Sequence, residues 1–142
     1  MKQTRSWARR CAVQSLYQMA LSGDETATTD LEFLAEEDSR RVNQQYFKKL
    51  IGHLAKHADE IDRLITPALD RDLAEVDPVE SAILRVGVCE LAYHPEIPCR
   101  VVINESVELA KLFGAEHGHK YVNSVLDKLA RQLRKTEMKT GS

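Results

Sequence analysis

The chain of 142 residues is long enough for one domain whose core needs neither disulfide nor metal. Its composition, 43% hydrophobic and 30% charged, is typical of a folded globular protein and excludes a disordered one. No apolar run approaches the ~20 residues of a membrane span, and no signal-peptide core follows the basic N-terminus, so we expect a cytoplasmic protein.

The charges are segregated along the chain although the net charge is only −2. Residues 1–23 carry four basic side chains and no acid, and residues 24–38 carry seven acids and no base. The chain is predominantly basic again after Leu126. Basic residues that cluster on one face can bind a nucleic-acid backbone even when the total charge is near neutral.

Apolar residues recur at spacings of three and four along most of the chain, which predicts an all-α protein. We expect helices at residues 5–21, 30–37, 42–55, 58–69, 78–93, 101–113 and 117–134. The first should end at Ser22-Gly23. Residues from Thr136 onward are expected to form a disordered tail.

The helix expected at residues 78–93 is apolar on nearly all sides and should therefore be buried between other helices. Its apolar residues lie on two sides, Ala82, Val86 and Cys89 on one and Leu84, Val88 and Leu91 on the other. Asp77 can cap its start, and Pro78 suits the first helical position. Pro95 and Pro98 should end it. We predict that this helix is the centre of the domain.

The first helix carries Arg10, Gln14 and Tyr17 at helical spacing opposite its apolar stripe, with Arg9 at the flank. An exposed tyrosine beside arginines can serve RNA, because the ring stacks on an unpaired base while guanidinium groups hold phosphates. The alternative is a solvated face with Tyr17 packed on a neighbouring helix.

No motif of an enzyme or a metal site is present: GxGxxG, GxxxxGK[ST] and a nucleophile elbow are all missing. His53 and His57 lie four residues apart but lack the HExxH glutamate and a third ligand. His117 and His119 likewise lack further local ligands. We therefore predict a non-catalytic protein without cofactor or metal.

Four stretches, taken together, resemble the NusB family: RRCAVQSLYQ (9–18), AILRVGVCEL (82–91), IPCRVVINESVELAKLFG (97–114) and HKYVNSVLDKLA (119–130). The resemblance covers residues 5–133 and implies a seven-helix fold of two small bundles in one domain, residues 1–135. It also implies a transcription antitermination factor that binds boxA RNA together with the ribosomal protein NusE. That complex joins the antitermination assembly on RNA polymerase, chiefly during ribosomal RNA transcription.

Carried over to this chain, the resemblance places RNA contacts on Lys2, Arg5, Arg9, Arg10, Tyr17, His117, Lys120 and Tyr121. It places the contact with NusE near Glu80, which could also serve as a helix cap. Ser6 and Trp7 stand where relatives can have arginines, so the basic arm is thinner here. Tyr121 lies near the edge of an apolar stripe, and packing in the core is its alternative role.

Arg85 and Glu90 lie on the helix that we expect to be most buried, where charges are seldom found without partners. We interpret Arg85 as paired with a neighbouring acid rather than with RNA. Two other functions stay open: a purely protein-binding adaptor, and a relative of the N-terminal domain of ribosomal RNA cytosine methyltransferases. A monomer and a homodimer are both compatible with the sequence.

Overall fold

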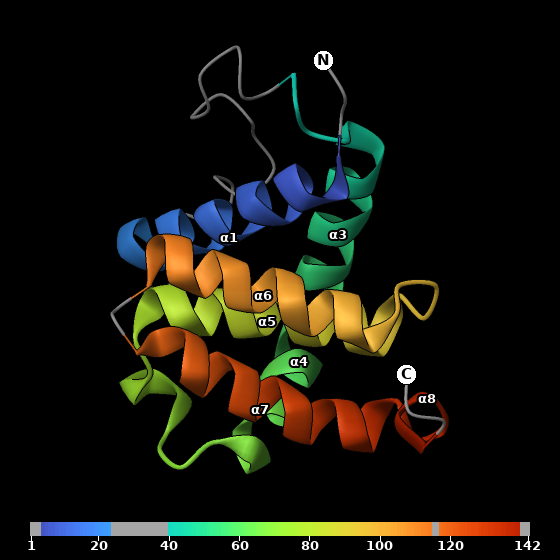
Figure 1. The fold of residues 1–142 in the computed structure, drawn as a ribbon. Helices are drawn as coiled ribbons and strands as arrows, with labels where there is room; N and C mark the ends of the chain where they lie inside the picture. Colours follow the sequence, from blue (N-terminus) through green and yellow to red (C-terminus); the bar gives the residue numbers. More distant parts are fainter. Residues whose placement is uncertain (1–3, 24–39, 115–116, 140–142) are drawn as a thin grey trace.

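The computed structural model describes residues 4–23, 40–114 and 117–139, and this part of the chain is helical without a β-strand (Figure 1). Its α-helices are α1 (Arg5–Ser22), α3 (Gln44–Lys56), α4 (Ala58–Ile65), α5 (Pro78–Tyr93), α6 (Cys99–Phe113), α7 (Gly118–Leu133) and α8 (Lys135–Lys139). Two short 3-10 helices, η2 (Thr66–Ala68) and η3 (Leu73–Glu75), connect α4 to α5. The predicted all-α fold is confirmed, while the helix expected at residues 30–37 lies outside the described residues.

Helix α5 is the centre of the fold, as its apolar sequence predicts. Residues 81–91 are all buried except Arg85. The helix contacts α1, α3 and α4 of the N-terminal bundle and α6 and α7 of the C-terminal bundle, so the two bundles share one core (Figure 1). The Asp77 carboxylate accepts hydrogen bonds from the backbone N–H groups of Val79 and Glu80, which fixes the start of α5 as predicted.

Gly87 lets α6 and α7 approach the middle of α5. A Cβ atom at this position would lie 3.1 Å from the Leu126 methyl carbons and from the Ser106 hydroxyl oxygen. Both residues are buried, so they have little room to move away. The central helix therefore meets its neighbours through a glycine rather than through a side chain.

The sequence predicts the end of one helix correctly and the end of another wrongly. Gly23 ends α1 in the left-handed conformation, with φ 72°, and its N–H donates to the Met19 carbonyl as in a C-terminal cap. The helix expected over residues 58–69 is instead broken, because α4 ends at Ile65 and only the 3-10 turn η2 follows. Pro67 offers no amide donor, so the α-helical hydrogen-bond ladder is interrupted there although Thr66 itself keeps helical dihedral angles.

The prediction of a disordered tail from residue 136 is wrong for residues 136–139, which belong to α8. The Glu137 carboxylate accepts hydrogen bonds from the Arg134 guanidinium, at 2.6 Å, and from the Cys99 backbone N–H at the start of α6. Arg134 is itself buried and donates to the carbonyl oxygens of Glu90, Leu91, His94 and Ile97. Arg134 thereby ties together the carbonyls at and beyond the end of α5, where a helix leaves backbone acceptors without intrahelical donors. Tertiary contacts therefore order a segment that its own sequence would leave loose.

Candidate nucleic-acid interface

Arg9, predicted to contact RNA, is instead buried in an ion pair. Its side chain donates from Nε to both carboxylate oxygens of Glu90, at 2.8 Å each, and from Nη1 to Glu105 at 3.2 Å. The Tyr46 hydroxyl also donates to Glu90. Burial raises the pKa of Glu90, while Arg9 and Tyr46 oppose that rise. With only 3% of Arg9 exposed, its role is to join α1 to α5 and α6, and it does not fit the predicted phosphate contact.

Arg85 has the role that the sequence predicts. Its guanidinium Nε lies 2.9 Å from Asp62 Oδ1, so the arginine on α5 is paired with an acid on α4. The pair is only partly exposed and lies away from the basic start of α1. The interpretation as an internal ion pair is confirmed.

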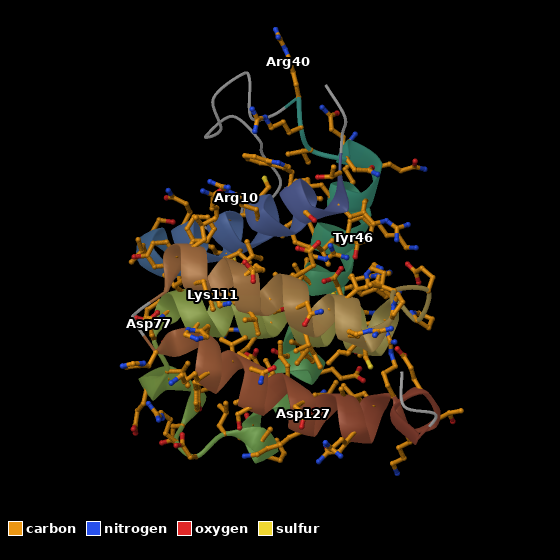
Figure 2. The ribbon with its side chains drawn as sticks, viewed as in Figure 1. Arg10, Arg40, Tyr46, Asp77, Lys111 and Asp127 are labelled. Atoms are coloured by element: carbon orange, nitrogen blue, oxygen red, sulfur yellow. The ribbon has the colours of Figure 1, made fainter. Side chains whose placement is uncertain are left out.

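The first half of α1 and the segment before α3 hold a first group of candidate residues, which we call the α1 patch: Arg5, Trp7, Arg10 and Arg41. Arg5 is exposed, and its guanidinium lies 4.9 Å from the centre of the Tyr46 ring. The guanidinium of Arg10 lies 4.5 Å from the Trp7 ring centre, on the outer side of the molecule (Figure 2). Cations at such distances from aromatic faces are attracted by the ring quadrupole.

Arg41 reaches this patch because the chain before α3 pairs with the start of α1. The Thr4 N–H donates to the Arg41 carbonyl at 2.8 Å, and the Asn43 N–H donates to the Thr4 carbonyl at 3.1 Å. The Arg41 guanidinium then lies 5.1 Å from the Trp7 ring centre. Arg40, one residue earlier, projects away from the body of the molecule (Figure 2).

The start of α7 holds a second group, which we call the α7 patch: Arg71, His117, Lys120 and Tyr121. His117 and Lys120 are exposed, and Tyr121 is partly exposed. The Tyr121 hydroxyl donates to Asp70 at 3.2 Å, and the Arg71 guanidinium lies 4.8 Å from the Tyr121 ring centre. Burial raises the pKa of Tyr121, so its hydroxyl keeps its proton and can donate. The ring therefore sits at the surface, packed on its inner side and covered by a cation.

Glu80 lies beside the α7 patch, in a hollow of about 370 Å³ lined by Arg71, Val76, Asp77, Glu80, His117, Gly118 and Tyr121. Gly118 allows this arrangement, since a Cβ atom there would lie 2.6 Å from the Glu80 carboxylate. Burial and the nearby Asp77 carboxylate raise the pKa of Glu80. The predicted partner contact, Glu80, thus shares one hollow with two of the predicted RNA contacts, His117 and Tyr121.

Arg10 links the two patches. Its guanidinium lies 5.2 Å from the ring centre of Phe113, the last residue of α6. Only three residues lie between Phe113 and His117 of the α7 patch, so these two positions are at most ~14 Å of backbone apart. One extended ligand could therefore contact both patches.

Two predicted RNA contacts belong to neither patch, and some residues of the patches were not predicted. Lys2 lies outside the described residues, and Tyr17 is partly exposed further along α1. Trp7 and Arg41 belong to the α1 patch, although the sequence does not single them out as RNA contacts. A signal for Trp7 was available, because RSWARR places an aromatic side chain among arginines. Arg41 had no such local signal, since its position depends on pairing with Thr4.

The described residues contain no group of three or more histidine, cysteine, aspartate or glutamate side chains arranged to hold a metal ion. His57 stacks on Tyr93 with ring centres 4.0 Å apart. His53 Nδ1 lies 2.9 Å from His94 Nε2. None of the helices described is long and apolar enough to cross a membrane.

Comparisons with known proteins identify a single family. The model of the NusB family matches residues 6–131. Transcription antitermination protein NusB of Nitrosococcus oceani is 49% identical over 140 residues, covering 99% of this chain and 94% of that protein. The protein of the same name from Shewanella pealeana is 51% identical over 122 residues, covering 86% and 90%.

Solved structures agree with the sequence relatives. The structure of T. maritima NusB superimposes with a TM-score of 0.80 at 27% identity, covering 93% of this chain and 94% of that chain. A structure of antitermination factors NusB and NusE in complex with dsRNA matches with a TM-score of 0.75 at 28% identity, covering 90% and 96%.

Proposed function

This chain belongs to the NusB family, and from that premise we propose that it is a non-catalytic transcription antitermination factor of the cytoplasm. In this proposal it binds boxA RNA together with the ribosomal protein NusE. The resulting complex acts on RNA polymerase, chiefly during ribosomal RNA transcription. The relative solved with NusE and RNA supports both proposed partners.

The position of Arg10, between Trp7 of the α1 patch and the end of α6 that leads to the α7 patch, is the observation that carries the proposal. Arg5, Arg10 and Lys120 supply cations for phosphates, and Tyr121 supplies a ring for a base. His117 belongs to the α7 patch, while the contacts at Tyr17, further along α1, and at Lys2 stay predictions. Arg9 is left out because its guanidinium is committed to Glu90 and Glu105.

The proposed NusE contact at Glu80 adjoins the α7 patch, so the two partners should help each other bind. Glu80, His117 and Tyr121 line the same hollow. A protein partner that fills this hollow would lie beside RNA held on His117 and Lys120. If the partner raises the affinity for RNA by some factor, RNA raises the affinity for the partner by the same factor.

The test is a titration of a short boxA RNA, labelled at one end, with the protein alone and with the protein plus purified NusE. We expect binding that tightens when NusE is present, and weaker binding of a scrambled RNA of equal length. Glu80→Gln should lower NusE affinity without lowering the melting temperature, whereas Glu108→Gln on the exposed side of α6 should leave it unchanged. NusE binding without any RNA binding would instead favour a protein-binding adaptor.

A further inference from the structure

We propose that Trp7 is a platform on which an unpaired RNA base stacks, with Arg10 and Arg41 holding the phosphates on either side of that base. This inference rests on the proposed function and adds a residue that determines how single-stranded RNA is held. We infer this role from the placement of Trp7 between two arginines of different segments. Its position in a basic run of the sequence and its family context do not assign the role.

The structure fixes Trp7 in place at the start of α1. Its backbone N–H donates to the Thr4 hydroxyl at 3.2 Å, which caps the helix. One part of the indole packs against the hydrophobic core, and the remainder is exposed. A base that stacks on this ring would meet a surface that is already ordered, so binding would lose little conformational freedom.

Two guanidinium groups flank the ring. Arg10 comes from α1, one turn further on, and lies 4.5 Å from the ring centre. Arg41 comes from the segment before α3 and lies 5.1 Å from it. The pairing of Thr4 with residues 41 and 43 holds the two segments together. Trp7 is therefore the centre of a cluster that two parts of the chain assemble.

The chemistry of this cluster fits unpaired RNA better than duplex RNA. An indole offers the largest aromatic face among side chains, and base–aromatic stacking requires a base that is not paired within a helix. A guanidinium group has planar N–H donors that match the geometry of a phosphate group. Alternating aromatic and cationic groups are typical of proteins that hold single strands.

The stacking role also offers a physical reason for a tryptophan at this position. The resemblance to the family indicates that arginines can stand at positions 6 and 7, so this chain has fewer cations at the start of α1. A stacked base would restore affinity through a contact that salt does not screen. The remaining cations would still contribute the salt-sensitive part of binding.

Trp7 is the only tryptophan in the sequence, so its emission reports on this site alone. The experiment titrates the full-length protein with a short single-stranded boxA RNA at low salt. Anisotropy of a label on the RNA measures binding, and tryptophan emission measures stacking. We expect the emission to fall along the same curve as the anisotropy rises. The same RNA annealed to its complement should leave the emission unchanged.

Variants separate stacking from folding. Trp7→Ala should weaken single-strand binding by about fivefold or more, the lower end of what one stacked base contributes. Trp7→Phe should retain part of the affinity, and Arg41→Gln should weaken binding without removing the emission change. Arg131→Ala, at an exposed arginine of α7 that pairs with Asp127, is the control that should change neither readout.

The possible outcomes distinguish this inference from the proposed function. RNA binding with unchanged tryptophan emission, or with unchanged affinity of a folded Trp7→Ala protein, would overturn the stacking role and leave the proposed function intact. The cluster would then be a structural link between α1 and residues 40–43. A wild-type protein that binds no RNA, alone or with NusE, would overturn both.

Discussion

Among the residues that the structure describes, charged side chains are buried where another element supplies a partner. Arg9 is buried against Glu90, and Arg134 is buried against backbone carbonyls and Glu137. His94, which is fully buried, has no such strong counter-charge. Its nearest titratable neighbours are His53, at 2.9 Å, and Glu96, at 3.5 Å. A buried histidine in this setting is expected to stay neutral.

The stability of the protein should consequently fall on mild acidification. Burial, followed by the neighbouring His53, lowers the pKa of His94 from 6.5 to about 4, and Glu96 only partly opposes this. Between these two values the unfolded chain binds the proton and the folded chain does not, so stability is retained above pH 6.5 and lost as the pH falls towards 4. From pH 7 to pH 5 we expect a loss of roughly 2 kcal/mol from this residue.

Urea denaturation of the wild type and of His94→Gln at pH 7 and pH 5 measures this loss. The wild type should lose more stability than the variant, because glutamine does not titrate. The raised pKa of Glu90 acts in the opposite direction, since the folded state then binds more protons than the unfolded one. That contribution is common to both proteins and cancels in the difference. Equal pH dependence in the two proteins would exclude His94 as the group responsible.

The sequence predicts an ion pair for Arg85 but not for Arg9, because the two arginines lie on helices of different character. Arg85 lies on an apolar helix, where any charge needs a partner. Arg9 lies at the edge of the apolar stripe on a helix with other arginines, so spacing alone does not distinguish a buried arginine from an exposed one. Its partner Glu90 is distant in sequence. An acid within the apolar stretch of α5 indicates a buried cation but does not identify which one.

At the scale of helices, the sequence predicts a boundary where a capping residue, a proline or a glycine at that boundary sets it. The bounds of α5 follow from Asp77, Pro78 and Pro95, and the end of α1 follows from Gly23. The break after α4 could have been read from Pro67. Helix α8 could not, because it depends on Arg134 and Glu137 joining the ends of α5 and α6. The interface likewise depends on Arg41, which only tertiary pairing brings to α1.

The Arg9–Glu90 pair should be the strongest single polar link between α1 and α5. Arg9→Met leaves the Glu90 carboxylate buried without its cation, and such a loss costs about 3–5 kcal/mol. The double variant Arg9→Met with Glu90→Gln removes the charge as well and should regain most of that stability. Chemical denaturation of the wild type, both single variants and the double variant measures the coupling.

The same variants decide between the structural role of Arg9 and its predicted RNA contact. A folded double variant should bind boxA RNA nearly as well as the wild type, because the structure assigns no phosphate to Arg9. Arg10→Ala, which removes an arginine from the outer face of the same helix, should weaken binding clearly. A double variant that is stable but binds RNA as weakly as Arg10→Ala would restore the predicted contact.

For the whole molecule, the distribution of charge matters more than its sum. The net charge of −2 would not by itself indicate a nucleic-acid ligand. The fold places the start of α1 beside residues 40–43, and Arg10 further along α1 reaches the end of α6, which leads to the start of α7. Cations from three separated segments thus form two linked patches, and their joint effect on RNA binding can be measured through its salt dependence.

RNA binding should weaken steeply as salt rises. Four cations of the two patches, Arg5, Arg10, Arg41 and Lys120, would each displace a counterion from a single strand. The logarithm of the binding constant should then fall with the logarithm of salt concentration with a slope of about −3. Lys120→Ala should make this slope less steep by about 0.7.

Lys128→Ala provides a matched control, because Lys128 is an exposed lysine on the same helix, outside the α7 patch. If both lysine variants kept the wild-type slope, Lys120 would contact no phosphate. A slope near zero for the wild type would mean that neither patch binds the RNA backbone.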